Sequence, residues 1–213
     1  MKSIIKILRF KSKTTIQTEV SLLAILITIL NLSAVKDVVT GIENMNCLDS
    51  LESIVSNEAK PLEQRSIALM AISNFITQSK KQTINHETQE FAIYVLENQK
   101  EVYSKGADKQ NKEVVKNTVY ASLILFYNLF LQYFAKIENK TGSSGNLVKE
   151  HQNLMEKLIT CLDKHVMDDF TDPTIVNVVL HLVTLFTKNT TTASLLFKNP
   201  RILAYIFNKL QKF

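Results

Sequence analysis

Apolar residues along this chain gather in long stretches that are separated by shorter polar segments. Residues 20–32 are mostly apolar, and residues 119–135 form a longer apolar stretch that carries Asn128 and Gln132. Between Leu147 and Val166 the apolar residues instead recur every three or four positions, the spacing of one face of a helix. These patterns predict helices throughout, buried where the apolar run is continuous and amphipathic where it is periodic.

A short pattern, in which apolar residues flank an asparagine, recurs within these stretches. The copies occupy residues 28–33, 71–76, 125–130 and, with threonine in place of asparagine, 182–186. Asn31 and Asn74 are 43 residues apart, which lies within the period of about 40–47 residues used by stacked helical repeats. The next two intervals, from Asn74 to Asn128 and from Asn128 to Thr184, are 54 and 56 residues. These longer intervals predict insertions.

Each long interval contains a polar segment that would account for the extra residues. Residues 99–112 are polar and include a glycine, and residues 138–146 hold two of the four glycines together with serines. Removing about ten residues at each place would restore a regular repeat. We therefore predict a single domain, 1–213, with polar insertions near 99–112 and 138–146 and with approximate units 1–34, 35–78, 85–135 and 147–213.

The order of the predicted elements also repeats. The first and last copies are each followed by a short helix, a break and a helix of medium length, with the breaks at 44–46 and 199–200. Asp172 and Pro173 predict a helix N-cap followed by proline at the first helical position. Pro61 stands just before another long helix in the same way.

Composition narrows the class of fold and the compartment. Hydrophobic residues make up 46% and charged residues 21%, which argues against disorder, and four glycines and three prolines are too few for a turn-rich β or α/β fold. The fold class we predict is all-α. Cys47 and Cys161 provide no disulfide framework, and the N-terminus lacks the features of a signal peptide. Both observations favour an intracellular protein, cytoplasmic and/or nuclear.

The charge distribution argues against two classes of partner. The net charge is +5, and five cations lie in the first thirteen residues, but no aromatic residues alternate with them to stack on bases. A solvated positive edge is the simpler interpretation, so nucleic acid is not the expected partner. Residues 20–32 are too short to span a membrane, and 119–135 has the polar and aromatic content of a central buried helix in a soluble fold.

Few residues are placed to carry chemistry. Cys161 and His165 are four apart on one predicted helix, with Asp168 and Asp169 just beyond, a spacing that would suit two metal ligands or a thiol and its base. Boundary residues of an amphipathic helix adopt the same spacing by default, and we favour that interpretation because no second such pair lies nearby. His181 is expected to be buried in an apolar helix. We therefore predict no catalytic activity, no metal and no cofactor.

The repeated pattern resembles armadillo-repeat proteins. Ala68, Ala71 and Asn74 match the small residues that precede an asparagine in the third helix of that family, and residues 29–33 (ILNLS) match its end. The resemblance covers residues 14–78 closely and 109–213 in outline. It implies a right-handed armadillo-like α-solenoid of about four irregular repeats, in which the third helices line a concave groove.

In that family the asparagine binds the backbone of an extended peptide. The resemblance therefore implies partner-binding roles in the groove for a set of five residues: Thr28, Asn31, Met70, Asn74 and Asn128. The alternative is that each asparagine caps a turn or bonds a neighbouring carbonyl inside the stack, and for Asn128 we favour this alternative because its spacing is less regular. Both interpretations remain open for Asn31 and Asn74.

One departure from the family excludes a subfamily. Nuclear-import adaptors of this fold place a tryptophan one turn before each asparagine, where it holds basic cargo. This chain contains no tryptophan and has Ile27, Met70 and Ile124 at the matching positions. Classical nuclear-signal binding is therefore not expected.

The function that we predict is a non-catalytic protein–protein interaction scaffold or adaptor. It would bind a partner peptide or helix in the groove, or at a solenoid end that lacks a polar cap, where a homo- or hetero-oligomer could also form. Residues 4–10 would close an earlier, incomplete unit. The alternatives are a substrate-recognition segment of a larger enzyme, such as a ubiquitin ligase, or a co-chaperone of an Hsp70-type ATPase.

Overall fold

Helices account for nearly all of the chain that can be described. The computed structural model describes residues 16–43, 46–78, 84–105, 109–139, 144–166 and 172–210, and no strand occurs in these ranges. This confirms the all-α class, whereas the predicted closing helix at 4–10 lies outside the described residues. The elements are α2 (Ile16–Ser33), α3 (Lys36–Glu43), α4 (Cys47–Ser56), α5 (Leu62–Gln78), α6 (His86–Lys105), α7 (Lys109–Asn139), α8 (Ser144–Cys161), the π-helical turn η1 (Leu162–Val166), α9 (Pro173–Thr187), α10 (Thr190–Phe197) and α11 (Pro200–Leu210).

Local sequence signals set several helix ends where they were predicted. The Asp172 side chain accepts a hydrogen bond from the Thr174 amide at 2.9 Å, and Pro173 is the first residue of α9. Asn46 lies in the predicted break before α4 with a φ of 54°, a left-handed conformation that asparagine tolerates better than most residues. The order of long, short and medium helix is confirmed twice, by α2–α3–α4 and by α9–α10–α11.

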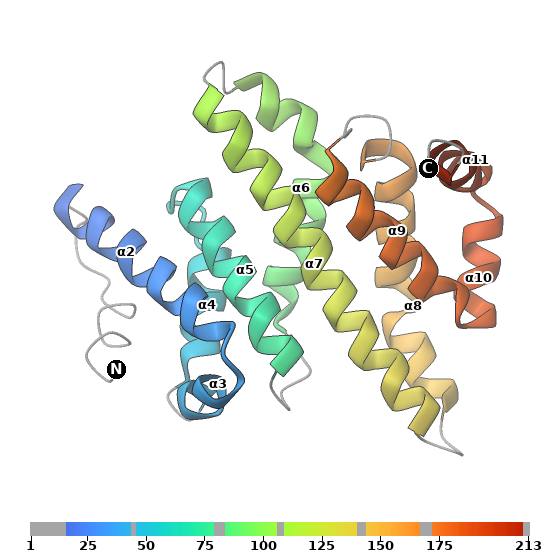
Figure 1. Cartoon of the computed structure of the whole chain (residues 1–213), viewed down its shortest axis with the longest axis horizontal. Coiled ribbons are helices and arrows are strands. Elements are labelled where there is room, and N and C mark those ends of the chain that lie inside the picture. Colours follow the sequence, from blue (N-terminus) through green and yellow to red (C-terminus); the bar gives the residue numbers. More distant parts are fainter. Residues whose placement is uncertain are drawn as a thin grey trace.

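The four helices that carry the recurring pattern, α2, α5, α7 and α9, lie side by side in one layer (Figure 1), and we call them the long helices although α6 and α8 are of similar length. Figure 1 shows α2, α5, α7 and α9 running in the same general direction, with α4, α6 and α8 behind them. Contacts follow the same order, from α2 to α5, α5 to α7 and α7 to α9 in the front layer, and from α4 to α6 and α6 to α8 behind. Two layers of helices bury their apolar sides against each other.

A single core joins these layers. It extends from Leu22 in α2 to Ile202 in α11 without a gap between clusters. Phe126 and Phe130 of α7 stack with their ring centroids 6.3 Å apart, and Phe130 meets Phe186 of α9 edge to face at 5.4 Å. Each of these rings is fully buried, and burial of a phenylalanine side chain stabilises a fold by about 1.5–3 kcal/mol.

Two polar segments are more helical than their composition suggested. Most of residues 99–112 belongs to the end of α6 and the start of α7, because the lysine, glutamine and glutamate residues there are good helix formers despite their polarity. The helix predicted from Leu147 begins earlier, at Ser144, and its last turn, Leu162–Val166, is π-helical. Polar composition alone did not distinguish a loop from an exposed helical turn.

Helix α7 is enclosed by three neighbouring helices. It contacts α5, α6 and α9, and its buried residues include those of the stretch predicted to be a central buried helix. By length and composition, the segment Lys112–Ala135 is the one stretch in the described ranges that could cross a membrane, and 61% of the 18-residue window that defines it is buried within the protein.

An ion pair joins α7 to the start of α9 and gives a pH-dependent prediction. Lys116 lies 2.9 Å from the Asp172 carboxylate, and this contact, followed by the Thr174 amide, lowers the pKa of Asp172 from 3.8 to about 2. Because folding favours the ionised carboxylate, its stabilising effect is present above pH 4 and is lost as the pH falls towards 2. Asp172→Asn keeps a capping oxygen but removes the charge.

We expect Asp172→Asn to lower the melting temperature at pH 5–7. The difference from the wild-type melting temperature should shrink as the pH falls from 4 to about 2. Lys116→Met should reproduce this profile, because it removes the other half of the pair. Circular dichroism melts across this pH range measure the effect. Parallel profiles for the wild type and both variants would show that the pair does not contribute.

Candidate functional site

The four long helices expose one stripe of side chains each on the same side of the molecule. In α5 the outward positions are Ile67, Met70, Asn74 and Thr77, and the intervening positions are buried against α2, α4 and α7. The stripe on α7 consists of Asn117, Tyr120, Ile124, Tyr127 and Leu131. We call the outward-facing residues of α2, α5, α7 and α9, within 20–33, 66–78, 117–135 and 173–187, the long-helix face.

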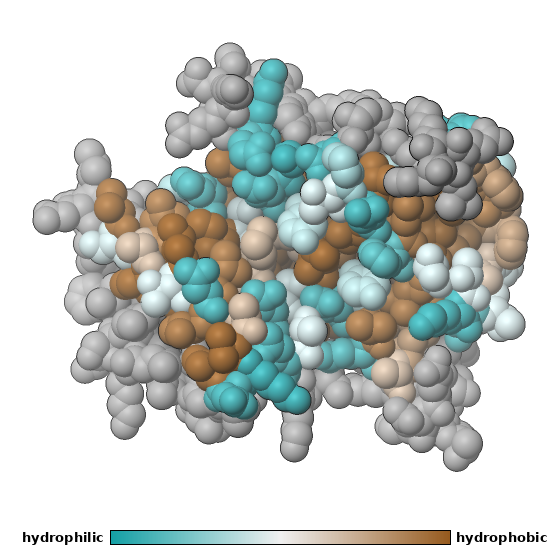
Figure 2. Space-filling view, in the orientation of Figure 1, coloured by the Kyte–Doolittle hydropathy of each residue, from teal (hydrophilic) through white to brown (hydrophobic). Residues whose placement is uncertain are grey.

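The long-helix face carries no charged side chain. Residues 20–33, 66–78, 117–135 and 173–187 contain no Asp, Glu, Lys or Arg, and the charged residues of these helices, such as Glu19, Arg65 and Lys116, lie nearer their ends. By contrast, α4, α6 and α8 of the other layer carry Asp, Glu and Lys along their length. Figure 2 shows hydrophobic and hydrophilic patches interspersed across this side. Ile27 is 44% exposed and Leu131 is 37% exposed on this face. Residues within these stretches can form apolar contacts and hydrogen bonds from uncharged groups, but they supply no carboxylate, lysine or arginine for an ion pair.

Amide side chains hold the long helices together at defined positions. Asn74 of α5 donates a hydrogen bond to the Ser33 hydroxyl of α2 at 3.1 Å. Asn128 of α7 donates to both the hydroxyl and the carbonyl of Ser73, at 2.9 and 3.3 Å. Gln78 and Gln132 add further bonds, to the carbonyls of Ala34 and Ile76 respectively. These bonds fix the register between α2, α5 and α7.

The five residues predicted to bind a partner therefore lie in different settings. Asn31 is exposed, and so is Thr28, whose hydroxyl donates to the Ala24 carbonyl at 2.9 Å. Met70 and Asn74 are half-buried on the face. Asn128 is only 9% exposed and bonds inside the stack, which was the favoured alternative for this residue. Four of the five residues remain at the surface and one belongs to the interior.

One histidine lies on this face against expectation. His181 was predicted to be buried in an apolar helix, but it is exposed, and its ring lies 6.0 Å from that of Tyr127 on α7. The prediction was wrong because α9 is buried on the sides that contact α7 and α10, and residue 181 falls on the remaining side. The aromatic pair adds a ring contact between α7 and α9 on the face.

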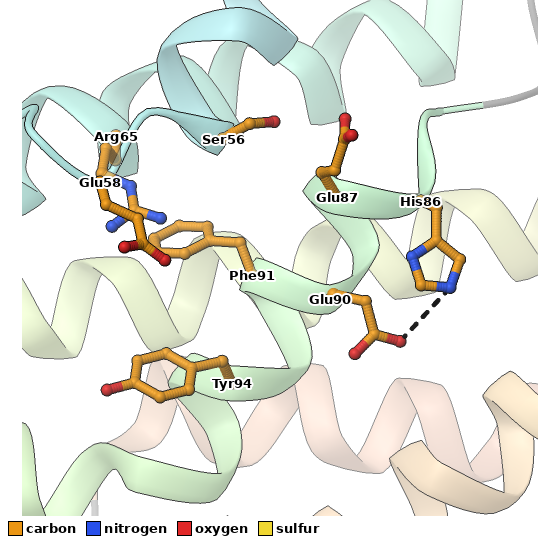
Figure 3. Close-up of a pocket in the computed structure, with 8 residues that line it drawn as sticks. All are labelled: Ser56, Glu58, Arg65, His86, Glu87, Glu90, Phe91 and Tyr94. Atoms are coloured by element: carbon orange, nitrogen blue, oxygen red, sulfur yellow. Dashed lines mark ion pairs between the residues drawn. The ribbon is translucent and has the colours of Figure 1, made fainter.

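A pocket of about 700 Å³ opens between α4, α5 and α6 (Figure 3). The Arg65 guanidinium covers the Phe91 ring at 3.8 Å, and its Nε donates to the Val55 carbonyl at 2.8 Å. Burial lowers the pKa of Arg65, and the charge of Glu58 opposes that shift. Sequence reasoning missed this pocket because its lining spans residues 56–94 with no recurring spacing.

Charges around the pocket are largely paired within the protein. Glu90 lies 3.0 Å from Lys157 of α8 and 3.7 Å from His86. Tyr94 at its edge is 51% exposed. With Arg65 fixed on Phe91 and the Val55 carbonyl, these pairings make the pocket a junction between α4, α5, α6 and α8.

Neither cysteine is suited to nucleophilic chemistry. Burial raises the pKa of the Cys47 thiol to about 11. Burial, with a smaller effect from the Glu97 carboxylate, raises the pKa of Cys161 to about 12. Both thiols are therefore protonated at neutral pH, whereas the thiolate is the reactive form. The side chain of His165 lies outside the described residues, and the described part of the chain has no group of three His, Cys, Asp or Glu residues that could hold a metal.

No protein-family model, curated protein or solved structure matches this chain. The resemblance to armadillo repeats therefore remains a prediction from the sequence. What the described residues establish is a face on four adjacent helices whose middle stretches carry no acidic residue, lysine or arginine, with α2, α5 and α7 held in register by amide side chains.

The different settings of Asn31 and Asn128 give a matched pair of variants. Asn128→Ala leaves the polar groups of Ser73 without their interhelical donor, and we expect it to lower the free energy of unfolding by about 1–3 kcal/mol. Asn31→Ala makes the same change at an exposed position and should alter the free energy of unfolding by no more than about 0.5 kcal/mol. Urea denaturation followed by circular dichroism measures both. Equal losses at the two sites would contradict a special role for the buried amide.

Proposed function

We propose that this chain is a non-catalytic protein-interaction scaffold, an armadillo-like right-handed solenoid that holds a partner's peptide or helix against its long-helix face. The observation that carries the proposal is the absence of charge from the long-helix face. Solvent alone does not disfavour charged residues on the outer side of a helix. Burial against a partner does, and charged residues are depleted from the centres of protein interfaces.

The packing order supports the solenoid part of the proposal. Each long helix contacts the next one in its layer, and the helices behind follow the same sequence, so that most contacts join neighbouring units. Such nearest-neighbour stacking is typical of repeat proteins. The group α3–α4–α5 supplies the three helices of one armadillo-type unit, whereas α6–α7 supplies only two.

The chemistry of the face limits the kind of partner. Ile27, Met70 and Ile124 replace the tryptophans of import adaptors, and no carboxylate on the face would attract a basic cargo. No cation on the face would attract phosphate, so a protein partner is favoured over nucleic acid. The same face would select substrates if the chain belongs to a larger enzyme such as a ubiquitin ligase, and it would serve equally in a co-chaperone. Two unpaired cysteines are compatible with the proposed intracellular location.

The C-terminal end of the stack offers a second contact surface. Phe197 of α10 is 68% exposed and Phe207 of α11 is 65% exposed. Large exposed aromatic side chains at the end of a helical stack favour association with a further unit or with a second copy. Oligomerisation through this end is therefore a second candidate function, independent of the long-helix face.

A photo-crosslinking experiment tests the scaffold proposal. Lysine-reactive reagents cannot report on a face without lysines, so a photoactivatable amino acid is placed at Leu131 on the face and, as a control, at Tyr94 in the other layer. After illumination in native extract, we expect protein adducts at position 131 and few at position 94. Adding Ile27→Lys should suppress the adducts at 131, because a charge would be buried at the interface. Mass spectrometry identifies the adducts.

More adducts at position 94 than at position 131 would show that the interface lies away from the long-helix face. The same conclusion would follow if the adducts at position 131 persist with Ile27→Lys. Circular dichroism of each variant verifies that the helical fold is intact. Both substituted side chains on the face are already partly exposed, so neither change has to disrupt the core.

A further inference from the structure

One row of apolar side chains crosses all four long helices at nearly the same level. It contains one residue from each helix, one turn before the recurring asparagine or threonine: Ile27, Met70, Ile124 and Leu180. All four are exposed or half-buried. The bonds from Asn74 to Ser33 and from Asn128 to Ser73 fix the register of α2, α5 and α7. The ring contact of Tyr127 with His181 places the middle of α9 beside the same part of α7. We call these four residues the apolar row.

The polar groups one turn further along are already engaged. The Asn74 amide donates to Ser33, the Asn128 amide is buried on Ser73, and the Thr184 hydroxyl donates to the Leu180 carbonyl at 2.8 Å. Asn31 and Thr184, on the two outer helices of the four, are exposed at this level, and the Thr184 hydroxyl is already engaged. An extended peptide needs partners for its own backbone amides and carbonyls when it is buried, and this level provides few.

We propose that the long-helix face accepts an amphipathic helix whose contacting side is apolar and free of charge, lying across the four long helices along the apolar row. This inference rests on the proposed function and specifies its partner. A helix satisfies its own backbone hydrogen bonds, so it requires only apolar contacts from the surface. A neutral face gains nothing from a charged partner, since an unpaired charge would be buried.

The geometry also sets the spacing of the partner's anchors. Packed helices lie about 8–10 Å apart, and a helix rises about 1.5 Å per residue, so a crossing helix passes one long helix roughly every seven residues. One apolar anchor for each of the four long helices should therefore recur at about i, i+7, i+14 and i+21, supported by neighbours at i+3 and i+4. A helix of about 20 residues would span all four long helices.

Two display libraries of equal length, about 20 residues, test the inference on the full chain. One library has a helix-forming framework with varied residues on one side, and the other contains fixed prolines that enforce an extended conformation. We expect binders from the helical library, with apolar anchors at the predicted spacing and no charge between them. Fluorescence anisotropy with a selected peptide should show affinity reduced about tenfold or more by Ile27→Lys. A central proline in the peptide should abolish binding.

The combined variant Asn31→Ala, Asn117→Ala, Asn177→Ala is the matched control, because all three side chains are exposed and are the amides an extended backbone would use. Under the helix proposal it should bind within about twofold of the wild type. Binders from the extended library that depend on these asparagines would overturn the inference and leave the scaffold function standing. If neither library yields a binder whose affinity falls with Ile27→Lys, the scaffold function itself is overturned.

Discussion

Helix α7 imposes the main constraint on this fold, because a long apolar helix has to be enclosed by other elements. Contacts with α5, α6 and α9 enclose it, and Phe130 of α7 meets Phe186 of α9 in the centre of the core. Once α7 is enclosed, the amides of Asn128 and Gln132 can no longer bond water. They bond Ser73 and Ile76 of α5 instead, so that the burial of α7 determines its register against α5.

The same type of bond carries the register outward to α2, through Asn74 and Gln78. Apolar burial and hydrogen bonding have different roles here. A buried phenylalanine contributes about 1.5–3 kcal/mol, whereas an intramolecular hydrogen bond adds a net 0.5–1.5 kcal/mol or so. Burial therefore supplies most of the stability. The amides select one alignment of the helices, because a shift would leave buried polar groups without partners.

The local features of this fold could be predicted from the sequence, but the rotation of each helix about its own axis could not. The Asp172 cap depends on residues next to it in the chain, and the order of long, short and medium helices follows from local periodicity. Asn74 and Asn128 occur in the same short pattern, yet one is half-buried and the other is buried. Their partners lie 41 and 55 residues away, and the exposure of His181 likewise depends on which sides of α9 its neighbours cover. Periodicity finds a helix but does not determine how far it is rotated in its layer.

Charged residues are absent from the middle stretches of the four long helices, although α5 and α7 carry Glu63, Arg65 and Lys116 near their starts. Each long helix has another long helix on one side or on both sides, and only a narrow stripe of its residues faces outward. Charged residues in that stripe would be in contact with solvent and would not be disfavoured. The helices behind do carry charges, and Glu90 of α6 is shared by His86 and Lys157 across that layer. Folding alone therefore gives no reason for the outward stripes of α5 and α7 to be neutral. Under the proposed function, desolvation by a partner would give one, because a charge buried without a counter-ion costs far more than an apolar contact gains.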